Sequence, residues 1–329
     1  KKLIIIVIFI NYITWNNSMV HIWNQPIIIN KDLAKNLIES QTDLKVSSIE
    51  KLGEGWDNIA YLINKDWVFR FPRREMGIDC LKNEIALTPY IATKVHFPFS
   101  YPQYIGKETE IYPAPFAGYK MVHGKPLSDT EPKLIDDFNF AKTLALLLKE
   151  LHSVPVQNHE IKLQGDQAWH YNLEQRLEKT KERILQYKPY FIDAGFDVDE
   201  LFKTIEKISK FNVDNLTKTS YVHGDIYGSH LLVDNNMNLS GIIDWGDVHI
   251  GNPGIDLSVT FMILSDTALK VFFDTYGPID NSTKNIALLR AFCHPIALLP
   301  YCYENNLSNL KEWGILALRN SINFITRGV

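Results

Sequence analysis

The sequence predicts an α+β protein with two lobes, a small antiparallel β-sheet lobe followed by a larger, mainly helical lobe. Short apolar runs separated by glycine-containing turns occupy residues 46–122, as in strands connected by hairpins. From residue 133 onward, apolar residues recur at the three- and four-residue spacing of helices. Gly124 and Pro126 interrupt both patterns and mark the connection between the lobes.

The composition agrees with a globular protein that buries a sizeable core. The chain has 329 residues, 46% of them hydrophobic, and can form one large domain or two lobes. A net charge of -4 from well-mixed acidic and basic residues gives no broad basic surface for nucleic acid. Cys80, Cys293 and Cys302 lack metal-ligand spacing, so we expect free thiols in a reducing, cytoplasmic environment.

The amino terminus imitates a signal peptide, because Lys1 and Lys2 precede the apolar run Leu3–Ile10. No small-residue cleavage site follows, and the run is too short to span a bilayer. We therefore expect residues 1–18 to be an upstream extension that is not part of the fold. The predicted lobes are then residues 19–122 and residues 123–329.

The elements of the first lobe follow from apolar periodicity and turn residues. The predicted order is a helix over 31–41, strands over 46–52, 59–63 and 67–72, a helix over 78–90 limited by Pro89, and three short elements ending with 117–122.

Gly53, Gly55 and Asn58 belong to the turn between the first two strands. Glycine lets backbone N–H groups approach a phosphate chain, although many such turns are ordinary hairpins. Arg70 is a single cation in the apolar strand 67–72, and it suits either a solvated edge or a phosphate site. If the helix 78–90 packs on this sheet, Glu84 can orient Arg70 toward phosphate oxygens.

The second lobe is predicted to be built from helices. Ser128 to Glu131 fits a capping box for a helix over 133–151, which is apolar nearly all round and is expected to form the central pillar of the lobe. Two amphipathic segments follow within 171–211. Further helices are predicted over 255–275, 283–299 and 308–325.

Polar residues are concentrated between Tyr221 and Asp256. The runs Leu231–Val233 and Leu239–Ile243 predict a β-hairpin, with Asp225 in the loop before it and Asp244 at its exit. Two carboxylates at one end of a hairpin can hold a divalent cation and orient an attacking hydroxyl.

These motifs carry a resemblance to a known family. His223-Gly224-Asp225, followed by His230 five residues after the aspartate and by the run Ile-Ile-Asp-Trp-Gly that contains Asp244, is similar to the signature of aminoglycoside phosphotransferase-type kinases. This protein-kinase-like superfamily also includes macrolide phosphotransferases and choline and homoserine kinases. The resemblance implies a protein-kinase-like fold and Mg²⁺-dependent transfer of the γ-phosphate of ATP or GTP to a hydroxyl of a small molecule. The acceptor it implies is an aminoglycoside or macrolide antibiotic, which would make the protein a resistance enzyme.

The resemblance also implies roles for individual residues. Asp225 resembles the catalytic aspartate that orients the acceptor hydroxyl and accepts its proton, and Asp244 resembles the aspartate that binds Mg²⁺. His230 stands where most members have an asparagine as the second metal ligand. The macrolide branch has a histidine at this position, as this chain does. His223 and Asp256 resemble residues that brace the catalytic loop.

The nucleotide site that the resemblance implies lies in the first lobe and the connector. Arg70 replaces the usual lysine and, with Glu84 and the glycine turn, would hold the phosphates. Met121 and His123 would offer backbone groups to the base. The resemblance leaves Asp247 and His249 without a role.

Other functions remain open on the residues alone. A His/Asp set on one hairpin also suits a metal-dependent phosphohydrolase, and the replacements at His230 and Arg70 suit a non-catalytic pseudokinase. A kinase of small metabolites such as choline or homoserine would carry the same motifs. In each case we expect a monomer or weak homodimer without nucleic acid or membrane partners.

Overall fold

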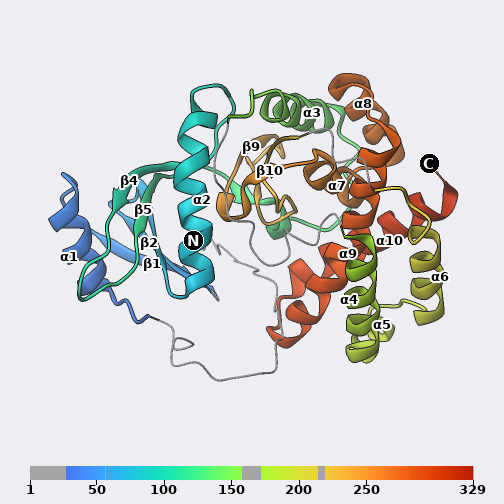
Figure 1. Cartoon of the computed structure of the whole chain (residues 1–329), viewed down its shortest axis with the longest axis horizontal. Helices are drawn as coiled ribbons and strands as arrows, with labels where there is room; N and C mark the ends of the chain where they lie inside the picture. The colour runs from blue at the N-terminus through green and yellow to red at the C-terminus, as the bar shows by residue number, and fades with distance from the viewer. Residues whose placement is uncertain (1–26, 56, 158–171, 214–218, 329) are drawn as a thin grey trace.

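The computed structural model describes residues 27–55, 57–157, 172–213 and 219–328. The predicted extension over residues 1–18, Trp56 in the glycine turn and Tyr171 at the start of the amphipathic segments lie outside these residues. The chain forms a β-sheet lobe and a helical lobe, with α2 (Glu75–Ala92) on the side of the sheet that faces the helices (Figure 1). The predicted boundary at residue 122 falls in the connector between β5, which ends at Lys120, and β6, which begins at Lys125.

The first lobe is an antiparallel sheet in the order β1-β2-β3-β5-β4. Its strands are β1 (Ile49–Glu54), β2 (Asn58–Ile63), β3 (Trp67–Pro72), β4 (Pro102–Gly106) and β5 (Phe116–Lys120). Helix α1 (Lys31–Gln41) begins at Asn30, whose side chain accepts a hydrogen bond from Leu33 N–H, as an N-cap does. The first helix and the second and third strands therefore match the sequence prediction closely, whereas the first strand begins at Ile49 instead of residue 46 and continues through Gly53, which the sequence places in the turn.

Helix α2 corrects the prediction that Pro89 limits its length. The helix begins at Glu75 and continues past Pro89 to Ala92. Proline removes one N–H from the ladder, and at this position the loss falls in the last turns, where the remaining residues are held by packing. Leu81 on α2 contacts Ala117 and Tyr119 of β5, so the helix covers the sheet.

The predicted hairpin is present as β8 (Leu231–Val233) and β9 (Leu239–Ile242), and the short strand β6 (Lys125–Pro126) adds to its edge. Strand β7 (Ser220–Val222) pairs separately with β10 (His249–Gly251). These two small sheets place the loop after β7 and the turn after β9 next to each other.

The capping box predicted at Ser128 is absent. Residues Leu127–Asp129 form a 3-10 turn in which Ser128 contacts the catalytic loop, through its N–H to the Gly228 carbonyl and its hydroxyl to Ser229. Helix α3 begins only at Phe138 and ends at His152, with Asp137 as its N-cap.

Backbone pairing between Ile135 and Leu264 explains two further corrections. Ile135 N–H donates to Ile263, and its carbonyl accepts from Ser265. This contact keeps the segment before Phe138 extended. It also splits the helix predicted over 255–275 into α7 (Gly254–Ile263) and α8 (Asp266–Tyr276).

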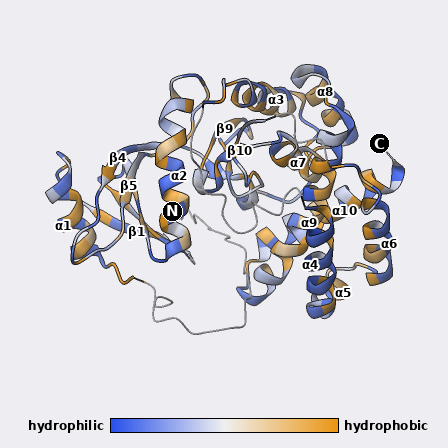
Figure 2. Cartoon of the chain, viewed as in Figure 1, coloured by the Kyte–Doolittle hydropathy of each residue, from blue (hydrophilic) through white to orange (hydrophobic). Residues whose placement is uncertain are grey.

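Helix α9 is the central helix of the second lobe, a place that the sequence pattern predicted for α3. Along α9 (Asn281–Glu304) most residues are buried, whereas Phe138 and Leu146 of α3 are more than half exposed. The other helices of the lobe are α4 (Leu173–Gln186), α5 (Lys188–Asp193), α6 (Val198–Ile208) and α10 (Ser308–Arg327). Figure 2 shows hydrophobic residues gathered where α7 and α9 pack and hydrophilic residues along α4.

The length and hydropathy of α9 would also suit a membrane span, but 83% of its apolar window is buried inside the protein. A mostly buried helix of this kind is a core helix. Each lobe has its own hydrophobic cluster: α1 packs with the sheet in the first, and α9 packs with α7 and α10 in the second.

Candidate active site

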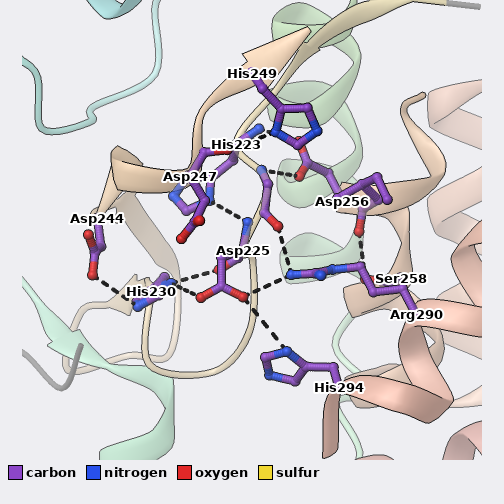
Figure 3. A network of polar contacts seen from close by, with 12 residues as sticks. His223, Asp225, His230, Asp244, Asp247, His249, Asp256, Ser258, Arg290 and His294 are labelled. Atoms are coloured by element: carbon purple, nitrogen blue, oxygen red, sulfur yellow. Dashed lines mark hydrogen bonds and ion pairs between the residues drawn. The ribbon is translucent and has the colours of Figure 1, made fainter. Parts of the chain in front are cut away.

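Asp225 lies at the centre of a buried polar network formed by the loop after β7, the hairpin and α9 (Figure 3). Its Oδ1 accepts a hydrogen bond from Arg290 Nη2 at 2.8 Å, and its main-chain carbonyl accepts one from His230 Nδ1 at 2.6 Å. Burial raises the pKa of Asp225, while His230 and Arg290 act in the opposite direction. The predicted catalytic carboxylate is therefore present, partnered and held in one orientation.

His230 and Asp244 face each other on the other side of Asp225. Because a carbonyl only accepts hydrogen bonds, the contact with the Asp225 carbonyl places a proton on His230 Nδ1, so Nε2 is the ring nitrogen that is left for another partner. This Nε2 is buried, makes no hydrogen bond within the described residues and lies 3.4 Å from Asp244 Oδ2. Asp244 itself has a left-handed backbone, with φ of 65°, which aims its side chain from the turn after β9.

The two residues fit a divalent cation. A histidine that binds metal usually donates its other ring N–H to a carbonyl, as His230 does. Mg²⁺ is typically bound through one or two protein groups together with substrate phosphates and water, and no group of three or more His, Cys, Asp or Glu residues with metal-site geometry occurs in the described ranges. The donor set therefore suits a cation that nucleotide oxygens complete.

Arg70 links the first lobe to Asp244. Its Nη2 lies 3.1 Å from Asp244 Oδ1, and its Nη1 lies 3.4 Å from Glu84 Oε2, which also accepts a hydrogen bond from Tyr119 at 3.0 Å. Burial would lower the pKa of Arg70, but the two carboxylates hold it above its usual value. Burial raises the pKa of Glu84 to about 7 although Arg70 opposes this. The predicted contact of Glu84 with Arg70 is confirmed.

Asp256 contacts the catalytic loop from behind. Its carboxylate accepts the N–H groups of His223 at 2.8 Å and Gly224 at 3.0 Å, and it lies 3.1 Å from His152 Nε2. Burial alone would raise the pKa of Asp256, but His152, His223 and the loop N–H groups keep it below its usual value. An ionised Asp256 thus fixes the backbone that carries Asp225.

His223 acts as a neutral brace. It donates from Nε2 to the Ile243 carbonyl at 3.0 Å and accepts the Asp225 N–H at Nδ1 at 3.2 Å. Burial lowers its pKa to about 4. His223 therefore ties the loop of Asp225 to the end of the hairpin.

A cleft lies between the lobes and ends at Arg70 and Asp244. Its lining is mostly apolar and comes from both lobes and the connector: Leu52, Val68, Arg70, Ser100, Tyr119, Lys120, Met121, Val122, Gly124, Leu232, Ile243 and Asp244. Apolar walls with a charged end are what a flat base attached to a phosphate chain requires.

The predicted nucleotide residues are distributed unevenly around this cleft. Arg70 and Met121 line it, whereas Gly53, Gly55 and Asn58 do not. The Gly55 N–H donates to the Asn58 carbonyl within the turn, and Arg73 reaches the Gly55 carbonyl at 3.4 Å. The His123 carbonyl is occupied by Ser240 Oγ at 2.9 Å.

Arg290 and His294 were missed from the sequence, although they are the residues of α9 that reach Asp225. His294 Nδ1 lies 3.7 Å from Asp225 Oδ1, the oxygen that Arg290 also contacts. Both stand in a strongly apolar helix four residues apart, hence on one face. Two cationic residue types on the buried face of a core helix are a signal that the sequence alone carries.

The sequence model of the phosphotransferase enzyme family matches residues 48–287, which is more than half of the chain. The chain belongs to this family. The phosphotransferase match runs from the first strand of the sheet lobe into α9 and includes Arg70, Asp225, His230 and Asp244, and it ends just before Arg290.

Curated relatives of this phosphotransferase include the aminoglycoside 3'-phosphotransferase of Escherichia coli, which is 28% identical over 151 residues. That alignment covers 45% of this chain and 52% of the relative, so the chain spans about half the length of the curated relatives it matches. The resemblance seen in the sequence is thus confirmed at the level of the family.

Solved structures share the fold over most of the phosphotransferase. The GDP and kanamycin complex of APH(2")-IIia superposes with a TM-score of 0.63 at 25% identity, covering 88% of this chain and 97% of that one. Macrolide 2'-phosphotransferase type I superposes with a TM-score of 0.56 at 17% identity, covering 87% and 97%. The predicted α+β, protein-kinase-like fold of two lobes is confirmed.

Proposed function

We propose that this phosphotransferase moves the γ-phosphate of ATP or GTP to a hydroxyl of a small molecule in a Mg²⁺-dependent reaction. An aminoglycoside or a macrolide is the acceptor that we propose. The main observation behind the proposal is that the cleft and the residues around Asp225 form one connected site. The cleft between the lobes ends at Arg70 and Asp244, and His230 connects Asp244 to Asp225.

The apolar part of the cleft suits the purine. Leu52 and Val68 from the sheet and Leu232 from the hairpin line it and can hold a flat ring from its two faces. The Met121 N–H is occupied by the Asp66 carbonyl and the His123 carbonyl by Ser240. We therefore assign the Met121 carbonyl and the His123 N–H to the edge of the base.

The charged end of the cleft suits the phosphates and the cation. His230 and Asp244 would hold Mg²⁺, which supplies neutralisation of the charge on the transferred phosphate when bound. Arg70 is positioned by Glu84 and Asp244 to pair with phosphate oxygens. Gly53, Gly55 and Asn58 do not line the cleft, and the role that we propose for them is to hold the turn between β1 and β2, where Arg73 contacts the Gly55 carbonyl and pairs with Glu54.

Asp225 favours transfer over simple nucleotide binding. A carboxylate close to a polyphosphate is repelled by roughly 1 kcal/mol or more even in screened surroundings, so it has no use in a site that only binds nucleotide. Asp225 Oδ2 can instead accept the hydrogen of an acceptor hydroxyl and orient its oxygen toward the phosphorus.

The names of the relatives support an aminoglycoside as the acceptor. The curated relatives are named aminoglycoside 3'-phosphotransferases, and one of the similar solved structures is a complex with both GDP and kanamycin. A reaction that consumes ATP or GTP also agrees with the cytoplasmic location expected from the free cysteines.

The test is an assay of Mg²⁺-dependent ATP and GTP consumption with a panel of aminoglycosides, macrolides and small amino alcohols, with detection of the phosphorylated product by mass spectrometry. We expect a phosphate ester on one antibiotic class and no product without Mg²⁺. Hydrolysis of simple phosphate esters without any nucleotide would instead indicate a phosphohydrolase. Product only with choline or homoserine would indicate a metabolite kinase, and binding without turnover a pseudokinase.

A further inference from the structure

We infer that Arg290 is a positioning residue for the transfer step, acting on the acceptor through Asp225. This inference rests on the proposed function and adds to it a group from α9, a helix that reaches the site from the core of the second lobe. Arg290 is 4% exposed and contacts the catalytic loop at two points (Figure 3).

The geometry of these two contacts supports a positioning role. The same nitrogen, Nη2, donates to the Gly224 carbonyl at 2.7 Å and to Asp225 Oδ1 at 2.8 Å. One contact fixes the backbone before Asp225, and the other fixes the rotation of its carboxylate. A hydrogen bond from a charged donor to a carboxylate is about twice as strong as a neutral one.

The two carboxylate oxygens of Asp225 differ in their surroundings. Oδ1 is held by Arg290 and faces His294 Nδ1 at 3.7 Å. Oδ2 lies 3.7 Å from His230 Nδ1, a nitrogen that donates to the main-chain carbonyl of Asp225 instead. One oxygen is therefore fixed, and the other is left for the acceptor hydroxyl.

The charges of the residues around Asp225 also support a positioning role for Arg290. Burial lowers the pKa of His294 well below its usual value, with Arg290 acting in the same direction, so His294 is neutral near pH 7. Among the α9 residues that face Asp225, Arg290 is thus the one that carries a charge. It offsets the cost of burying the carboxylate and keeps the orientation that transfer requires.

The decisive variant is Arg290→Met. It keeps roughly the length of the side chain and removes the charge and the nitrogen that donates to Gly224 and Asp225. Because misplacement of a catalytic group by about 1 Å can cost about 100-fold in rate, we expect kcat to fall about 100-fold. The nucleotide Kd and the acceptor KM should stay within about twofold of wild type, since neither ligand touches Arg290. Arg290→Lys, which keeps a cation that can donate to both partners, should recover part of kcat.

Arg319→Met is the matched control, because Arg319 also donates to a backbone carbonyl, that of Ala194, but lies on α10 away from Asp225. It should transfer phosphate at the wild-type rate. If Arg290→Met does not fold, Arg290→Gln carries the same expectation.

Three results separate the possibilities. Wild-type kcat in a folded Arg290→Met or Arg290→Gln protein would overturn the inference and leave the proposed function intact. Parallel losses of melting temperature, nucleotide affinity and kcat would reduce Arg290 to a brace of the fold and overturn it as well. Failure of wild-type protein to phosphorylate any acceptor would contradict the proposed function itself.

Discussion

Asp225 and Asp244 have different proposed roles, and single substitutions separate them: Asp225 serves transfer, whereas Asp244 serves both transfer and nucleotide binding. We predict that Asp225→Asn abolishes transfer while the Kd for Mg-nucleotide changes by less than about threefold, because Asp225 Oδ1 is held by α9 and does not line the cleft. Asp244→Ala should lose both transfer and binding, because it removes a proposed cation ligand and the partner of Arg70. Isothermal titration with a non-hydrolysable nucleotide, together with the transfer assay, checks both. Equal nucleotide affinity in the Asp244→Ala protein would contradict the assignment.

His223 makes stability depend on pH. Its pKa is about 4 in the folded protein because of burial, against 6.5 in the unfolded chain, so below pH 6.5 the unfolded state binds more protons. The stabilisation that a neutral His223 provides is therefore complete above pH 6.5 and is lost as the pH falls toward 4. The loss amounts to about 3 kcal/mol.

Urea unfolding from pH 7 to pH 4 measures this effect. In His223→Asn the unfolding free energy should fall less steeply with decreasing pH than in wild type, because asparagine does not titrate. Other buried histidines such as His249 and His294 titrate in both proteins and cancel in the comparison. Identical slopes would show that His223 is not kept neutral by the fold.

Which residues could be predicted from the sequence depends on how local their partners are. Asp225, His230 and Asp244 are close in sequence and share one hairpin, so their proximity follows from a single turn. Glu84 and Arg70 needed only a helix packed on its neighbouring strands. Arg290 lies 65 residues from Asp225 in sequence, and no local pattern places α9 against the catalytic loop.

The bounds of helices and strands could be predicted wherever the local sequence pattern determines them. α1, β2, β3 and the hairpin follow the sequence closely, because apolar spacing, an N-cap and turn residues all agree there. The start of α3 and the break between α7 and α8 depend instead on one tertiary pairing, of Ile135 with Leu264. Helical periodicity continues through both segments and gives no sign of that pairing.

The loop that carries Asp225 packs closely against the turn after β9, and Gly224 makes this close approach possible. Gly224 has φ of 90°, and a Cβ at this position would lie 2.2 Å from the Asp247 carbonyl oxygen. We predict that Gly224→Ala displaces the loop, costs about 3 kcal/mol of stability or more and reduces transfer at least about 100-fold.

Gly277→Ala is the matched comparison for this prediction. Gly277 also has a positive φ, of 108°, but a Cβ there meets nothing within 4 Å. It should lose only about 1–2 kcal/mol from backbone strain and keep its activity. Thermal unfolding and transfer assays on both proteins test this, and comparable activity in the two variants would show that the contact with Asp247 is unimportant.

At the scale of the whole molecule, the two lobes share the cleft, and the hydrophobic cluster of the helical lobe extends into the first lobe through Leu87 and Ile91 of α2. Ligand in this cleft should therefore stabilise both lobes together. We predict that Mg-nucleotide at 100 times its Kd raises the unfolding free energy by about 2.7 kcal/mol, seen as one shifted transition in calorimetry. Asp225→Asn should show the same shift, and two transitions of which only one moves would mean that the nucleotide contacts a single lobe.

The sequence showed the two-lobed plan through its change of periodicity near the connector. It did not show which helix would be central, because α3 and α9 are both apolar and burial depends on what packs around them. Phe138 and Leu146 remain exposed on α3, whereas Leu289, Phe292 and Ile296 of α9 are buried.

The position of α9 also constrains how this protein can evolve. The turns that present Arg290 and His294 to Asp225 also carry Leu289 and Phe292 into the core, so the same turns serve the site through one set of side chains and the fold through another. Sequence changes that leave both unaffected are therefore expected on exposed segments of the helical lobe, such as the junction around Asn305 and Asn306. Such segments can diverge between relatives while the middle of α9 stays unchanged.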